Sequence, residues 1–307
     1  MSEMDRSTLR LADGRVLDVR TAGPVDGPLH LHFHGTPGSS FVDRVLLGSL
    51  LARGLRVVTW SRPGYSLSTP QPGRTIASVA DDAREVLDQL GVDSATASGW
   101  SGGGPHVLAF AALLPERCRA ASVLAGVAPY AESLGELDFF DGFGQDNVDE
   151  FGAAIDGEEQ VRAFLAPFVE AFRSIGRDDI VGEIASLLPE ADRRWIAGDY
   201  GHDLAQEFRE AVEVSGEGWV ADDLAFVQEW GFELGAIHVP VALWHGTADL
   251  MVPSPHGRWL AQAMPQADAH LLEGEGHLSV VLGRSQEIVD ALLAAARGAA
   301  AGTPWPW

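Results

Sequence analysis

Residues 95–110 read Ala-Thr-Ala-Ser-Gly-Trp-Ser-Gly-Gly-Gly-Pro-His-Val-Leu-Ala-Phe, and this stretch decides the fold. The run that ends at Trp100 predicts a short buried strand, and the apolar run after the glycines predicts a helix. Ser101 lies at the corner between them, with Gly99 and Gly103 two residues to either side. Such a corner strains the serine backbone and pushes the hydroxyl out of the sheet, and the glycines leave room beside it. Ser101 is therefore a candidate nucleophile.

Two further polar residues follow predicted strands downstream. Asp249 comes after the apolar run 239–244 in a turn, and His277 comes after the run 269–272, where we expect it to open the C-terminal helix. Alone, each has an ordinary explanation, since aspartates often form turns and histidines occur in first helical turns. Together the three residues occur in the chain order Ser, Asp, His, and each lies just after a predicted strand.

These three motifs resemble the alpha/beta-hydrolase fold, and within it the capped serine hydrolases, which include esterases, proline iminopeptidases and cofactor-free haloperoxidases. The resemblance covers nearly the whole length of the core. It implies an α/β fold with a mostly parallel sheet flanked by helices, in which Ser101 is the nucleophile, His277 the base and Asp249 the orienting acid. Epoxide hydrolases and haloalkane dehalogenases resemble this architecture but carry aspartate at the corner, so their chemistry is not expected here.

The loop after the apolar run 29–33 reads His-Gly-Thr-Pro-Gly-Ser-Ser and resembles the His-Gly-x-Pro loop of that family. An oxyanion hole needs two backbone N–H groups aimed at the developing charge. We expect Gly102 to give one. Thr36 is the better donor of the second, because Pro37 has no N–H. We expect His34 to fix this loop, and an ordinary Gly-Pro turn is the alternative interpretation of the segment.

The chain of 307 residues, 46% of them hydrophobic, is long enough for one large core with an insertion. Strand and helix alternate from the helical run that begins at Ile76 to Leu124 and again from Val239 to Ala296, which predicts a core in two parts, residues 1–128 and 236–307. Residues 129–235 show helical stripes and no strand alternation, which predicts a helical cap. The stripe that begins at Val161 and includes Phe164, Phe168 and Phe172 is interpreted as a core face.

Charge is concentrated in the predicted cap. Residues 129–234 hold 26 Asp and Glu against 6 Arg, a net charge of −20 out of −23 for the chain. This acidity argues against binding to nucleic acid or an anionic membrane. It favours a neutral or cationic small-molecule substrate over an anionic one. The sequence contains no lysine, which excludes a phosphate-binding loop ending in Gly-Lys-Ser or Gly-Lys-Thr.

Cysteine usage and hydropathy bear on the cellular setting. Cys118 is the single cysteine, so an internal disulfide and a cysteine-based metal site are excluded. No apolar run approaches the length of a membrane span, and the first residues lack the order of a signal peptide. We expect a cytoplasmic protein without a cofactor, and a homo-oligomer is left open.

Other polar residues receive structural interpretations. His30, His32 and His34 alternate along a predicted strand, as ligands of a metal might. The loop that follows lacks the Asp and further His typical of metallo-hydrolases, so we expect buried histidines bonded within the sheet and no metal. Arg62 and Tyr65 lie in a loop that resembles the family pattern only loosely, and we interpret them as structural loop residues.

The leading functional hypothesis is hydrolysis of a carboxylic ester or lactone through an acyl-enzyme. Amide cleavage of the proline iminopeptidase type is the first alternative, because those relatives hold a substrate amine with acidic cap residues. Peroxide-dependent halogenation and carbon–carbon bond hydrolysis could use the same three residues. A protein of a different class, a non-catalytic small-molecule binding protein on a hydrolase fold, is also left open.

Overall fold

The computed structural model describes residues 4–184 and 187–299. Its centre is a sheet in the strand order β1-β2-β4-β3-β5-β6-β7-β8. The β1–β2 and β2–β4 pairs are antiparallel, and the pairs from β4–β3 onward are parallel. The strands are β1 (Asp5–Arg10), β2 (Val16–Ala22), β3 (Leu29–Phe33), β4 (Arg56–Trp60), β5 (Ala95–Trp100), β6 (Cys118–Leu124), β7 (Val241–Gly246) and β8 (Asp268–Leu272).

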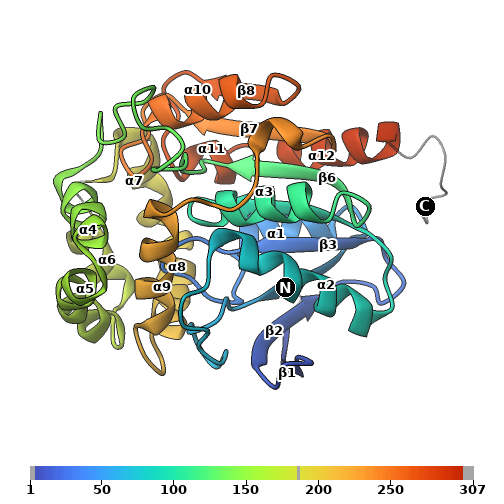
Figure 1. Cartoon of the computed structure of the whole chain (residues 1–307), viewed down its shortest axis with the longest axis horizontal. Helices are drawn as coiled ribbons and strands as arrows, with labels where there is room; N and C mark the ends of the chain where they lie inside the picture. The colour runs from blue at the N-terminus through green and yellow to red at the C-terminus, as the bar shows by residue number, and fades with distance from the viewer. Residues whose placement is uncertain (1–3, 185–186, 300–307) are drawn as a thin grey trace.

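Helices cover both faces of this sheet (Figure 1). One hydrophobic cluster joins the sheet to α2, α3 and α10, and a second joins it to α1, α11 and α12. These helices are α1 (Arg44–Leu51), α2 (Val79–Leu90), α3 (Gly103–Leu113), α10 (Ser254–Ala263), α11 (Ser279–Leu282) and α12 (Ser285–Ala299). Short 3₁₀ helices, η1 (Ile76–Ser78) and η3 (Leu234–Ala236), precede α2 and β7. The predicted α/β fold with a mostly parallel, helix-flanked sheet is confirmed.

The segment between β6 and β7 forms a group of helices beside the sheet, on the side toward which the arrows of β6 and β7 point (Figure 1). The helices are α4 (Gln145–Asp156), α5 (Glu158–Phe172), α6 (Arg177–Glu183), α7 (Glu190–Ile196), α8 (Tyr200–Ala211) and α9 (Glu217–Val227). We call this group the cap. Because parallel strands end at this edge, the loops after β3, β5, β7 and β8 meet the cap there.

The start of the C-terminal helix differs from the prediction. His277 lies two residues before the short helix α11, so the expectation that it opens the C-terminal helix is wrong. The turn before α11 is closed by a side chain, since the Gly276 N–H donates to the Ser279 hydroxyl at 2.8 Å. Gly283 and Arg284 then separate α11 from α12.

The structure holds no helix long and apolar enough to cross a membrane within the described ranges.

Candidate active site

Ser101 lies directly between β5 and α3 with φ at 54°, a left-handed conformation that is uncommon for a residue with a side chain. A Cβ atom at Gly99 would come within 2.6 Å of the Gly103 carbonyl carbon, and one at Gly103 would come within 2.7 Å of the His34 carbonyl oxygen. Both positions therefore require glycine. The prediction that these glycines make room around the serine is confirmed.

Asp249 and His277 follow the neighbouring parallel strands β7 and β8, and they contact each other. The His277 Nδ1 atom lies 2.8 Å from Asp249 Oδ2, and both side chains are buried. Asp249 Oδ1 accepts the backbone N–H groups of Met251 and Val252 at 2.8 and 2.9 Å, which fixes the carboxylate. Burial alone would lower the pKa of His277, but the charge and hydrogen bond of Asp249 raise it above its ordinary value of 6.5.

Ser101 and His277 line one pocket together with Trp100. The rings of Trp100 and His277 stack with their centroids 6.2 Å apart. Among the described residues the Ser101 hydroxyl makes no hydrogen bond, and bonds of this kind often close only when a substrate is bound. The structure thus brings Ser101 and His277 to one pocket and joins Asp249 to His277 by a hydrogen bond.

The two expected oxyanion donors lie side by side at this pocket. A Cβ atom at Gly102 would come within 2.8 Å of the Thr36 Cβ atom, so the loop after β3 touches the corner that carries Ser101. Within the part of the chain that the structure describes, the backbone N–H groups of Thr36 and Gly102 have no acceptor. Two unused N–H groups beside a candidate nucleophile are what a developing oxyanion needs.

The loop after β3 is held by His34 and Arg62. His34 Nδ1 lies 2.7 Å from the Gly35 carbonyl oxygen, and its Nε2 accepts the Arg62 backbone N–H at 3.0 Å. The Arg62 guanidinium donates to the carbonyl oxygens of His34 and Gly35 at 2.5 and 2.8 Å. The structural interpretation of His34 is confirmed. Arg62 has a more specific part than predicted, because it fixes the loop that carries Thr36.

Asp222 of cap helix α9 is the ion-pair partner of Arg62, and the sequence analysis did not identify it. Its buried carboxylate lies 2.5 Å from Arg62 Nη2 and 2.7 Å from Arg74 Nη1, and it accepts the Thr36 hydroxyl at 2.7 Å and the Tyr65 hydroxyl at 2.8 Å. Burial alone would raise the pKa of Asp222, but the two guanidinium groups hold it well below its ordinary value. The cap thereby anchors the loop of the expected oxyanion hole.

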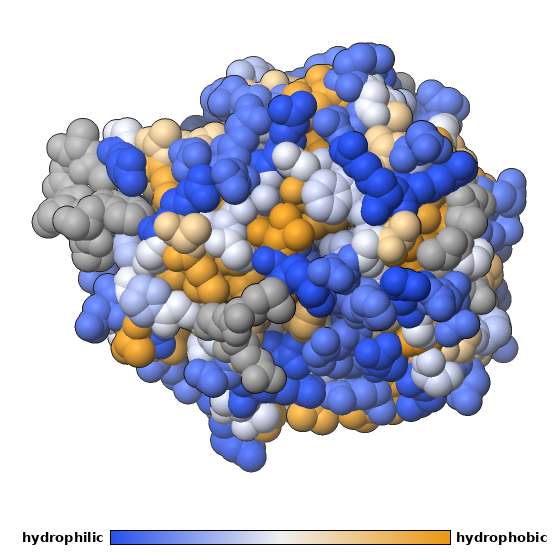
Figure 2. All heavy atoms as spheres, turned by 180° about the vertical axis from the view of Figure 1, so that it is seen from behind, coloured by the Kyte–Doolittle hydropathy of each residue, from blue (hydrophilic) through white to orange (hydrophobic). Residues whose placement is uncertain are grey.

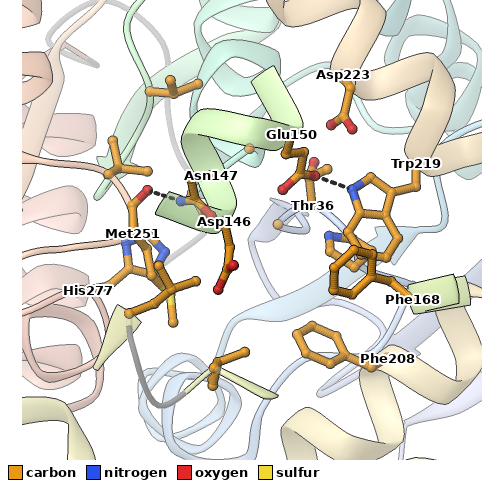
Figure 3. A pocket seen from close by; sticks show the side chains of 18 of the residues that line it. Thr36, Asp146, Asn147, Glu150, Phe168, Phe208, Trp219, Asp223, Met251 and His277 are labelled. Atoms are coloured by element: carbon orange, nitrogen blue, oxygen red, sulfur yellow. Dashed lines mark hydrogen bonds between the residues drawn. The ribbon is translucent and has the colours of Figure 1, made fainter. Parts of the chain in front are cut away.

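The pocket lies between the cap and the core and has a volume of about 210 Å³. Rings from four cap helices are among its lining residues: Phe151, Phe164, Phe168, Phe172, Tyr200, Phe208, Trp219 and Phe226. In the view of Figure 3, His277 lies on the left, and Phe168, Phe208 and Trp219 lie on the right. The stripe on α5 is only partly a core face: Val161 and Leu165 are buried, whereas Phe164 and Phe168 line the pocket. Periodicity alone could not separate these two faces of one helix.

The alternating histidines lie apart from the pocket lining. His30 bonds to the hydroxyls of Thr96 and Ser98 at 3.0 and 2.9 Å, and His32 bonds to Ser98 at 2.9 Å. Bonding within the sheet, as predicted, is confirmed for both. Among residues 4–184 and 187–299, no three or more His, Cys, Asp and Glu side chains are grouped to hold a metal ion.

The family model of the alpha/beta hydrolase fold matches residues 31–283. The chain is 34% identical over 118 residues to the bifunctional esterase/perhydrolase DCH of Acinetobacter calcoaceticus, a match that covers 38% of this chain and 43% of that protein. It is 26% identical over 249 residues to a non-heme chloroperoxidase of Streptomyces lividans, covering 80% and 83% of the two chains.

Among solved structures, the esterase EaEST of Exiguobacterium antarcticum superposes with a TM-score of 0.64 at 20% identity, covering 95% of this chain and 99% of that one. At that identity the likeness concerns the fold. The family match extends over β3 to α11 and therefore includes Ser101, Asp249 and His277. The chain belongs to the alpha/beta-hydrolase fold family.

Proposed function

We propose that this protein is a serine hydrolase that cleaves a carboxylic ester or a lactone through an acyl-enzyme. One observation carries the proposal: a strained serine, a histidine bonded to a carboxylate and two unused backbone N–H groups meet at one apolar pocket. The relatives named as esterases support the choice of bond. The proposal includes a cytoplasmic setting, which the single, buried Cys118 supports because one cysteine cannot form an internal disulfide.

In the acylation step, the Ser101 oxygen attacks the carbonyl carbon while His277 Nε2 takes the hydroxyl proton. Asp249 holds the Nδ1–H and stabilises the imidazolium that forms. The N–H groups of Thr36 and Gly102 donate hydrogen bonds to the carbonyl oxygen and stabilise the negative charge that develops on it. The imidazolium then gives its proton to the leaving alcohol, which departs as the acyl-enzyme forms.

In the deacylation step, His277 takes a proton from water as the water attacks the acyl carbon. The second tetrahedral intermediate collapses, the proton returns to Ser101, and the carboxylic acid is released. The aromatic lining supports a hydrocarbon-like substrate, because burying apolar surface there contributes about 25 cal/mol per Å². The acidic cap supports a substrate that is neutral or cationic.

Labelling with a fluorophosphonate tests this proposal. The protein should be labelled at one site, and Ser101→Ala should abolish both the label and ester turnover, the latter by roughly 10⁴-fold or more. Ser122→Ala is the matched control, because Ser122 is buried in β6 and should leave both readouts unchanged. Labelling that survives in Ser101→Ala contradicts the proposal. Labelling with acyl release slower than minutes indicates the binding-protein alternative.

A second candidate activity, cleavage of an amide next to a free amine, is favoured by two carboxyl groups in the pocket. Glu150 of α4 and Asp223 of α9 both line the pocket, and Trp219 Nε1 donates to Glu150 at 2.6 Å (Figure 3). Burial raises the pKa of both, and the charge of Glu150 raises that of Asp223 further. A carboxylate among aromatic rings is an environment suited to an ammonium group.

Aminoacyl 4-nitroanilides and their N-acetyl forms separate the two activities. If the second candidate is correct, the free-amine substrates are cleaved faster and Glu150→Gln removes that preference. Glu158→Gln, a mostly exposed acid on α5, is the matched control and should keep it. Absence of nitroanilide cleavage by a protein that turns over nitrophenyl esters eliminates amide cleavage and leaves the leading proposal standing.

A further inference from the structure

A carboxylate of the cap lies against the turn that carries His277. Asp192 of α7 is 0% exposed, and its Oδ1 atom accepts the Ser279 backbone N–H at 2.8 Å. Asp192 therefore binds a backbone donor two residues after His277, although it lies 85 positions before His277 in the sequence.

The glycine before His277 is explained by this contact. A Cβ atom at Gly276 would come within 2.6 Å of Asp192 Cγ, closer than real Cβ atoms approach. Gly276 does not have a positive φ angle. Glycine is therefore required at this position for space and not for a left-handed backbone conformation. The residue is small because the Asp192 carboxylate occupies the place of a side chain.

The remaining oxygen of this carboxylate has no hydrogen-bond donor. Asp192 Oδ2 is buried and receives no N–H or O–H group among the described residues. The titratable groups that act on this turn are Asp249 and His245 from the β7 side and Tyr200 from α8. Asp192 and Asp249 both raise the pKa of His277, so an imidazolium there is near two carboxylates, one from the core and one from the cap.

We propose that Asp192 is a positioning residue that links the cap to the catalytic histidine: it fixes the turn through the Ser279 backbone N–H and its close contact with Gly276, and it adds a second negative charge beside the imidazolium. This inference rests on the proposed function in that His277 is taken as the base. Its chemistry is electrostatic, and no bond to Asp192 forms or breaks during the reaction.

An NMR titration of the His277 ring in the Ser101→Ala background tests the inference without any turnover. Asp192→Asn keeps an oxygen acceptor for the Ser279 N–H and removes the charge, so the pKa of His277 should fall by about 0.5–1 unit. Asp199→Asn removes an equal charge from the exposed start of α8 and should leave that pKa unchanged. An unchanged His277 pKa in folded Asp192→Asn overturns the inference.

Kinetics of the active protein give a second readout. In Asp192→Asn the acid limb of kcat/KM should move to lower pH by the same amount, and kcat on the plateau should fall about 3–10-fold. If Asp192 had only a structural role, Asp192→Asn would change kcat or the melting temperature and leave the acid limb of kcat/KM at the same pH. That result would overturn the electrostatic role. Gly276→Ala, which displaces the carboxylate without changing charge, should move the limb in the same direction and serves if Asp192→Asn does not fold.

The two proposals fail in different ways. A parent protein that fluorophosphonate does not label at Ser101 contradicts the hydrolase proposal, whatever the titration of His277 shows. A labelled, active protein in which Asp192→Asn leaves the His277 pKa and the acid limb unchanged contradicts only the role of Asp192.

Discussion

At the scale of single residues, the strain at Ser101 is the feature that the surrounding structure must support. A non-glycine residue at φ 54° costs about 1–3 kcal/mol, and it persists where the neighbouring structure fixes it. Here the Ser101 N–H donates to the Leu124 carbonyl oxygen at 2.8 Å, and the Gly104 N–H donates back to the Ser101 carbonyl oxygen at 2.8 Å. Both bonds hold the backbone, which leaves the hydroxyl as the group free to react.

Asp249→Asn should lower kcat by about 10⁴-fold with little change in KM. The amide favours the wrong tautomer of the His277 imidazole, and it has no negative charge to stabilise the imidazolium. Stopped-flow or steady-state assays on a nitrophenyl ester measure this. Asp268→Asn is the matched control, since Asp268 begins β8 and its side chain is 75% exposed. A variant Asp249→Asn with activity within tenfold of the parent would assign the orienting role to another group.

The pH dependence of the parent protein follows from the same pair. Only neutral His277 accepts the serine proton, so kcat/KM should rise with pH and reach half its maximum above pH 6.5, the ordinary value for histidine. Stability depends on pH in the opposite direction. The His277–Asp249 pair makes its full contribution to the free energy of unfolding below the pKa of His277 in the unfolded chain, and this contribution is lost as pH rises through the pKa of His277 in the folded protein. A kcat/KM profile with its midpoint below pH 6.5 contradicts this.

At the scale of elements, α9 and the loop after β3 depend on each other through Asp222. Replacing Asp222 by Asn leaves Arg62 and Arg74 buried without their counter-charge, which should destabilise the fold by about 3–5 kcal/mol. Urea unfolding measures the change, with Asp178→Asn as control because Asp178 is an 86% exposed cap residue. Because the pKa of Asp222 is lowered in the folded protein, Asp222 stabilises the fold above its pKa in the unfolded chain. This stabilisation is lost as pH falls through its pKa in the folded protein.

The contribution of Asp222 also marks the limit of sequence reasoning. Strand and helix periodicity and the glycine pattern around Ser101 are local, so the sheet, the corner and the positions of Asp249 and His277 after β7 and β8 could be predicted. Asp222 meets Arg62, 160 positions away, only after the cap folds over the core. In the sequence its Ala-Asp-Asp-Leu surroundings resemble an ordinary solvated helix face. Asp192 escaped prediction for the same reason.

At the scale of the whole molecule, charge and apolar surface are distributed differently. Seen from behind, hydrophilic residues cover most of the face, and hydrophobic residues appear in separate small groups (Figure 2). The large apolar surface is turned inward, where the cap rings face the loops of the core. Nearly all of the net charge belongs to the segment that forms the outer wall of the pocket. We therefore expect a substrate to cross a negative field before it reaches the apolar cavity.

This field should set a preference between substrates that differ only in charge. A neutral methyl ester should be cleaved with a higher kcat/KM than its carboxylate-bearing analogue at about 10 mM salt, where charges are felt over roughly 30 Å. The ratio of the two kcat/KM values should fall toward a constant as salt approaches about 1 M, where the screening length is roughly 3 Å. The neutral ester is the internal control, because its own kcat/KM should depend little on salt. Faster cleavage of the anionic ester at low salt would show that the cap charge does not act on the pocket, since repulsion of an anion by this wall cannot change sign.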